Sequence, residues 1–283
     1  MKKILLILFI LVTSFGVISC NDIETENDKP IVAVSIAPQE AFVKAVAGDL
    51  VDVITLIPPG YSPANYEPSV KIMEDLSNAE VYFTIGAPTE SGNILPDINE
   101  ILVVHLEDAV KDVYPDRTFS DGGRDPHIWL SIKRVKIMIQ VIADTLSSID
   151  PVNQSLFQTN AYNYISLLDQ TDTQIQAKFE DFTMKTFIVF HPSYGYFADE
   201  YGINMVTLEE DGKEATIQHM NEVIDLANSL QIHTVFYQIE IDSSQVNSFA
   251  EEINGESVSL NPLSSDYINN LLEMADLIGS AMR

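Results

Sequence analysis

Two of the five histidines in this sequence occupy positions where an imidazole could bind a metal ion. His191 directly follows the apolar run Thr186–Phe190, at the point where a strand would end and the chain would turn towards solvent. His127 lies two residues before the only tryptophan, and Asp125 is near enough in the sequence to orient its ring. Neutral imidazole is the commonest side-chain ligand of transition metals. We therefore expect both histidines, one from each half of the chain, to bind a metal or another polar ligand in a shared cleft.

The remaining chemistry-bearing residues favour a binding function over an enzymatic one. His105, His219 and His233 lie in an apolar run, on a predicted helix and in a predicted loop, and we expect structural or surface roles for all three. The sequence contains no GxSxG, no HExxH and no glycine-rich phosphate loop. Cys20 is the only cysteine and lies in the N-terminal segment, so thiolate catalysis is not expected.

A stiff loop follows the second predicted strand. Residues 58–68 read PPGYSPANYEP and are rich in proline. Loops at the carboxyl ends of parallel strands are where α/β proteins usually bind ligands. The polar side chains of this loop, however, are only Ser62, Asn65, two tyrosines and Glu67. The loop therefore has the position of a binding loop but carries no strong metal ligand.

Eight short runs rich in β-branched or aromatic residues predict strands. They are Ile31–Ala37, Val51–Ile57, Val81–Gly86, Ile101–Leu106, Thr186–His191, Asn204–Leu208, Thr234–Gln238 and Glu256–Leu260. Most are separated by segments of helical length and period, which is typical of parallel sheets covered by helices. The runs fall into two groups of four, on either side of a stretch between residues 125 and 185 that has no strand signal.

Two long helices are expected in that stretch. The first has apolar residues at helical spacing and ends at Asp150-Pro151, and the second buries a long stripe. These residues are Val135, Ile139, Ile142 and Leu146, then Phe157, Ala161, Tyr164, Leu168, Ile175 and Phe179. The predicted fold is α/β with two lobes, each a roughly four-stranded, mostly parallel sheet flanked by helices, joined by a long rigid helix. The predicted divisions are a signal peptide at 1–19, a flexible tether at 20–30, an N-terminal lobe at 31–153, a linking helix at 154–181 and a C-terminal lobe at 182–283.

The N-terminal segment predicts export and attachment to a membrane. Lys2 and Lys3 precede the nearly continuous apolar run Ile4–Ile18, which is short for a membrane-spanning helix. The run ends just before Cys20, as in a bacterial lipoprotein signal that is cut before a cysteine which then carries lipid. An uncleaved N-terminal anchor is the alternative. Both interpretations place the rest of the chain outside the cytoplasm, at the periplasmic side of a membrane or the cell surface.

The net charge argues against a nucleic-acid partner. The chain carries 42 acidic and 15 basic residues, for a net charge of −27. Nucleic-acid binding requires a basic surface, and an acidic one repels phosphates. A solvated acidic surface explains the charge, and a field that attracts cations is the more specific alternative.

Three motifs resemble those of a known family. DPHIWLS at 125–131, HPSYGYFADEYGI at 191–203 and GYSPANYEP at 60–68 are similar to motifs of the zinc- and manganese-binding lipoproteins of ABC-type metal importers. The resemblance covers essentially the whole chain after the signal. It implies two α/β lobes joined by one stiff helix, with a metal held between the lobes and delivered to a membrane permease. It also implies that His127 and His191 are metal ligands.

The sequence departs from the family at the other ligand positions. Ala64 stands where the family has histidine, Asn261 stands where it has a ligating aspartate, and Gln238 stands where it often has glutamate. Zinc favours four ligands drawn from imidazole, thiolate and carboxylate, so neutral amides would give weaker binding. The candidate substitutes and cleft residues are Asn65, Glu67, Glu209, Gln238, Glu240, Asn261 and Asp266.

The sequence thus predicts an extracytoplasmic binding protein and not an enzyme. We expect it to capture a divalent transition metal, with zinc first and manganese or iron as alternatives, and to deliver it to an ABC permease. We also expect a monomer tethered by lipid on Cys20. Three alternatives stay open: a diverged relative that binds a metal–chelate or another small ligand, a metal-assisted hydrolase, and a surface adhesin.

Overall fold

The computed structural model describes residues 29–98, 100–182, 184–210, 212–213, 215–241 and 244–282. The predicted signal peptide, Cys20 and most of the predicted tether lie outside these residues. Within the described ranges, no helix has the length and apolar character needed to cross a membrane.

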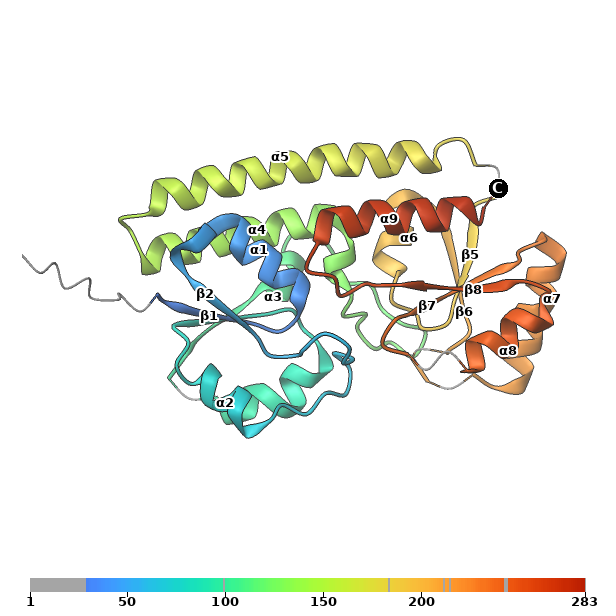
Figure 1. The fold of residues 1–283 in the computed structure, drawn as a ribbon, viewed down its shortest axis with the longest axis horizontal. Coiled ribbons are helices and arrows are strands. Elements are labelled where there is room, and N and C mark those ends of the chain that lie inside the picture. The colour runs from blue at the N-terminus through green and yellow to red at the C-terminus, as the bar shows by residue number, and fades with distance from the viewer. Residues whose placement is uncertain are drawn as a thin grey trace, which may run out of the picture.

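Two four-stranded parallel sheets form the centres of two lobes (Figure 1). The first sheet has the order β2-β1-β3-β4 and the second has the matching order β6-β5-β7-β8. The strands are β1 (Ile31–Val34), β2 (Asp52–Thr55), β3 (Val81–Thr84), β4 (Leu102–His105), β5 (Thr186–Val189), β6 (Asn204–Thr207), β7 (Thr234–Gln238) and β8 (Glu256–Leu260). The predicted fold class is confirmed.

Each predicted run contains a strand, but several of the runs are longer than the strands. The run Ile31–Ala37 ends as β1 at Val34, because Ala37 already begins the first helix. Hydrogen bonds continue past some strand ends: the backbone N–H of Phe190 donates to the carbonyl oxygen of Phe236 at 2.8 Å. Apolar runs therefore predicted that each strand exists better than they predicted where it ends.

Helices cover the sheets and complete the core (Figure 1). They are α1 (Ala37–Ala47), α2 (Val70–Leu76), α3 (Leu106–Lys111), α4 (Ile132–Ile149), α5 (Gln154–Phe179), α6 (Gly195–Tyr201), α7 (Ile217–Leu230), α8 (Ser244–Glu252) and α9 (Tyr267–Ser280). The inner strand β3 contributes Val81, Tyr82 and Phe83, all fully buried. This is expected for a parallel strand covered on both faces.

Helix α5 runs along both lobes (Figure 1). It packs against α1 and α4 of the first half and against α6 and α9 of the second. Its buried residues are Phe157, Ala161, Leu168, Thr171, Ile175 and Phe179. Thr171 joins this face although it is polar, because its hydroxyl donates to the carbonyl oxygen of Leu167 at 2.9 Å. The exact division of the chain into lobes and linker stays a prediction.

Candidate metal site

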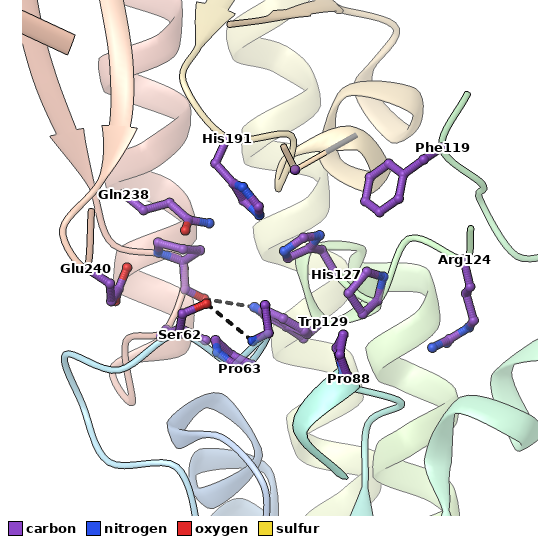
Figure 2. Close-up of a pocket in the computed structure, with 15 residues that line it drawn as sticks. Ser62, Pro63, Pro88, Phe119, Arg124, His127, Trp129, His191, Gln238 and Glu240 are labelled. Carbon is purple, nitrogen blue, oxygen red and sulfur yellow. Dashed lines mark hydrogen bonds between the residues drawn. The ribbon is translucent and has the colours of Figure 1, made fainter. Parts of the chain in front are cut away.

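A cavity of about 180 Å³ opens at the carboxyl ends of the strands and is lined by both lobes (Figure 2). We call its two sides the loop wall and the histidine wall. The loop wall consists of Ser62, Pro63, Ala64 and Pro88. The histidine wall consists of Phe119, Arg124, Pro126, His127, Trp129, His191, Gly212, Gln238, Glu240, Pro262 and Leu263. The position of the cavity agrees with the general location of ligand sites in open α/β sheets.

His127 is buried and held by a carboxylate. Its Nδ1 and its backbone N–H both donate to Oδ1 of Asp125, at 2.8 and 3.0 Å. Asp125 is fully buried, and its Oδ2 accepts from Nη1 of Arg117 at 3.2 Å. Burial lowers the pKa of His127, and the hydrogen bond to Asp125 partly opposes that shift. Because Nδ1 carries the donated proton, Nε2 keeps the lone pair that a metal requires.

His191 is held in a similar way but is more accessible. Its Nδ1 lies 2.6 Å from Oε2 of Glu209, and its side chain is 20% exposed. Gly212 has a positive φ of 74° and packs against the ring. A Cβ at that position would lie 3.3 Å from Cε1 of His191, so glycine allows the chain to pass closely over the imidazole.

The structure brings the two predicted histidines together. Their ring centroids are 5.6 Å apart and their planes are inclined by 77°. Figure 2 shows both rings on the same side of the cavity. Among the described residues, however, no group of three His, Cys, Asp or Glu side chains is close enough to hold a metal ion. The pair can therefore supply two nitrogen ligands, and further donors must come from elsewhere.

The segment before α4 that carries His127 is fastened to the second lobe. The backbone N–H of Arg117 donates to the hydroxyl of Tyr196 at 2.8 Å, and Nε of Arg117 donates to Asp199 at 3.1 Å. Trp129 Nε1 donates to the carbonyl oxygen of Pro262 at 2.8 Å. Its own carbonyl oxygen accepts from the hydroxyl of Tyr267 at 2.6 Å. The segment that carries His127 is therefore fixed to the lobe that carries His191.

Gln238 and Glu240 line the same wall. The side-chain amide of Gln238 donates to the hydroxyl of Ser193, which fixes its orientation. Oε2 of Glu240 is buried and has no hydrogen-bond partner among the described residues. Burial raises the pKa of Glu240. The Gln238 amide therefore has a hydrogen-bond partner, whereas one oxygen of the Glu240 carboxylate has none in the described chain.

The loop at residues 58–68 has a fixed shape but presents no ligand. The hydroxyl of Thr89 accepts from the backbone N–H of Tyr66 at 3.0 Å, and the Thr89 N–H donates to the carbonyl oxygen of Pro63 at 3.2 Å. Ala64 lines the cavity. Asn65 and Glu67 are exposed and do not line it. Neither is placed to replace a lost ligand in this arrangement.

Asn261, Glu209 and Asp266 have other partners. Oδ1 of Asn261 accepts from the backbone N–H of Leu263 at 3.1 Å, which shapes the turn after β8. Glu209 binds Nδ1 of His191, so it orients a ligand rather than replacing one. Asp266 is exposed and its carboxylate accepts from Asn269. None of the three lines the cavity.

Two supporting residues carry no local sequence signal. Arg117 pairs with Asp125, eight positions later in the sequence. Arg124 lines the cavity, and its guanidinium donates to Asp116 and to the carbonyl oxygen of Gly86. Both lie in an irregular stretch, where spacing predicts no shared face. The proline-rich loop and the PHIW motif predicted where the cavity lies, but they did not predict these contacts.

Comparisons with known proteins agree with the fold. The profile of the family described as zinc-uptake complex component A, periplasmic (ZnuA), matches residues 32–281. A crystal structure of ZnuA has a TM-score of 0.85 and 29% identity, covering 90% of this chain and 100% of that one. The iron ABC transporter substrate-binding lipoprotein MtsA of Streptococcus pyogenes serotype M6 is 25% identical over 268 residues, 89% of this chain and 86% of MtsA.

The zinc-binding lipoprotein AdcA of Streptococcus pneumoniae strain R6 is 26% identical over 282 residues, 94% of this chain but only 56% of AdcA. This chain therefore spans about half of that relative. The ZnuA family consists of transport binding proteins and not of enzymes. The family match over nearly all the described residues, with the two parallel sheets and the long helix, shows that this chain belongs to the ZnuA family of metal-binding substrate-binding proteins of ABC metal importers.

Proposed function

We propose that this protein captures a divalent transition metal ion with His127 and His191 as its protein ligands and delivers the ion to an ABC permease. The observation that carries this proposal is the paired arrangement of the rings. Each Nδ1 is bound to a carboxylate, and the rings lie 5.6 Å apart on one wall of a cavity. Carboxylate-bound imidazoles are pre-oriented and more basic ligands, which is how metal sites are commonly built.

Zinc is the ion that this site fits first. Zinc accepts imidazole nitrogen at about 2.0–2.1 Å and favours four-coordinate geometry. Family membership and the name of AdcA both support zinc, whereas the name of MtsA supports iron as an alternative, with manganese a further one. Two imidazoles leave coordination positions open, so we expect weaker binding of the bare ion than at a site with four protein ligands.

The protein acts outside the cytoplasm, attached by lipid on Cys20. The N-terminal pattern of two lysines, an apolar run and a cysteine supports this attachment, as do the lipoprotein names of AdcA and MtsA. A monomer suffices because both histidines come from one chain. The partner is an ABC permease in the same membrane.

Calorimetric titration of the chain from Asn21 with zinc, manganese and iron tests the proposal. We expect one zinc ion per chain, and a loss of affinity of about a hundredfold or more for His127→Ala or His191→Ala. His219→Ala is the matched control, because its Nε2 binds the carbonyl oxygen of Thr207 outside the cavity. Zinc binding that survives both cavity substitutions would disprove the assignment. Anomalous scattering at the zinc edge would locate the ion directly.

A further inference from the structure

We infer that the cavity takes its metal as a complex with a small chelator that carries a carboxylate, an inference that rests on the proposed metal-binding function. The first reason is a shortage of donors. The two histidines supply two nitrogens, and no third His, Cys, Asp or Glu of the described chain joins them. A chelator with two donor atoms fills the remaining positions of a four-coordinate ion.

The second reason is the size of the cavity. Its volume of about 180 Å³ is roughly 12 to 18 times the ~10–15 Å³ that one water molecule needs. A bare ion with one or two waters would leave most of this space unfilled by protein or ligand atoms. A small organic molecule bound to the ion would fill it.

The third reason is the chemistry of the lining. Prolines and aromatic rings make up much of both walls, with few polar groups among them. The apolar lining residues are Pro63, Ala64, Pro88, Phe119, Pro126, Trp129, Pro262 and Leu263. Apolar walls with a small number of convergent polar groups are typical of sites for small organic ligands. A bare, strongly hydrated ion gains nothing from such walls.

The fourth reason is a pair of unsatisfied groups of opposite charge. Figure 2 shows Arg124 and Glu240 on opposite sides of the histidine pair. Nη2 of Arg124 and Oε2 of Glu240 are buried and have no hydrogen-bond partner among the described residues. Buried groups of this kind cost free energy until a partner is supplied. The other nitrogens of Arg124 already donate to Asp116 and to the carbonyl oxygen of Gly86, so Nη2 is the nitrogen that lacks a partner.

These two groups define what the chelator must carry. Arginine pairs preferentially with carboxylates, so a carboxylate belongs at the Arg124 end of the cavity. Glu240 accepts hydrogen bonds, so an N–H or O–H donor belongs at the other end. Amino acids and hydroxycarboxylic acids both combine a carboxylate with such a donor, and both chelate zinc. The metal stays on the two histidines while the organic part occupies the remaining volume.

The test is equilibrium dialysis and native mass spectrometry of the detergent-extracted full protein. Its arms are zinc alone, zinc with L-histidine, zinc with citrate, and each chelator alone. We expect the protein to retain one zinc together with one chelator. We also expect it to bind that complex at least about tenfold more tightly than bare zinc. The L-histidine and citrate arms distinguish an amino-acid chelate from a hydroxycarboxylate chelate.

Substitutions then separate this inference from the proposed function. In Arg124→Ala and in Glu240→Gln, the preference for the complex over bare zinc should fall by about tenfold. Lys111→Ala is the control, since Lys111 approaches Asp116 at 3.9 Å but does not line the cavity. If the chelators only strip zinc from the protein, and Arg124→Ala leaves the preference unchanged, the inference is wrong although metal capture stands. If no arm shows zinc binding, the proposed function itself fails.

Discussion

The two walls of the cavity differ in how much of the site each one holds. The histidine wall carries both candidate ligands, and each ligand has its own carboxylate partner. The loop wall has a well-fixed backbone but presents only Ser62, Pro63, Ala64 and Pro88. A metal bound here would therefore be held from one side.

The same contrast appears between equivalent places in the two sheets. β3 and β7 occupy matching positions, and a glutamate follows each. Glu90, after β3, accepts from the backbone N–H groups of Ile85, Gly86 and Ala87 and from the hydroxyl of Ser35. Glu240, after β7, has an oxygen with no partner in the described chain. The first glutamate organises its loop, whereas the second makes no such contact with this oxygen.

The two carboxylates that hold the histidines, Asp125 and Glu209, can be compared by replacing each with its amide. Asp125→Asn should weaken zinc binding by about 10–100-fold, because Asp125 is fully buried and holds both His127 and Arg117. Glu209→Gln should cost less, about tenfold or below, because Glu209 is partly exposed. Calorimetric titration measures both, with thermal unfolding as the control for folding. Equal losses would show that burial of the partner carboxylate does not matter.

The loop wall can be tested by returning a ligand to it. Ala64→His should raise zinc affinity by at least about tenfold, or about 1.4 kcal/mol, because Ala64 lines the cavity. Asn261→Asp should give a smaller gain, because the Asn261 side chain binds the N–H of Leu263 and does not line the cavity. Asn65→His is the matched control on an exposed neighbour. No gain from Ala64→His would mean that the loop wall is too far from the ion to contribute.

Acid should weaken binding through the histidine wall. Imidazole binds metal only when neutral, and burial lowers the pKa of His127 below its usual value of about 6.5. The loss of affinity caused by protonation of His127 should therefore begin only below about pH 6.5 and grow as the pH falls further. Titrations at pH 7.5, 6.5, 6 and 5.5 would show it. Constant affinity across this range would exclude histidine ligation.

The smallest effect on zinc affinity is expected for Glu90→Gln, since Glu90 supports only the loop wall. Its effect on stability should be clear. Burial raises the pKa of Glu90 from 4.5 to about 7, with nearby Glu107 adding to the shift and the hydrogen bond from Ser35 opposing it. Protonated Glu90 therefore stabilises the fold fully below about pH 4.5, and this stability is lost as the pH rises through about 7, a change of about 3 kcal/mol.

Urea unfolding at several pH values would measure this change as a difference between parent and variant. The difference should vary with pH for Glu90→Gln but not for Glu80→Gln, a control at an exposed position. Parallel pH curves for the parent and Glu90→Gln would contradict the assigned role of Glu90.

From the sequence alone the fold class could be predicted, and His127 and His191 could be named as candidate metal ligands. Alternating apolar runs and helical stripes are local patterns, and they predicted eight strands, α4 and α5, because burial on a sheet or helix face repeats at fixed spacing. His127 and His191 were predicted from their motifs and from their place at a strand end or next to PHIW. The sequence also showed that Ala64 and Asn261 differ from the residues of the family pattern, because this needs only a comparison of motifs.

The contacts that hold the two walls of the cavity could be read only from the three-dimensional structure. Nothing local to residues 115–131 indicates that this segment is fastened to Tyr196, Asp199 and Pro262 of the second lobe. Nothing local shows that Glu209 orients His191, or that Asn65 and Glu67 are not among the residues that line the cavity. These contacts join residues that are far apart in the chain, and irregular loops have no period from which a shared face can be read. Which donors surround a metal, and which are missing, is therefore set by the packing of the lobes.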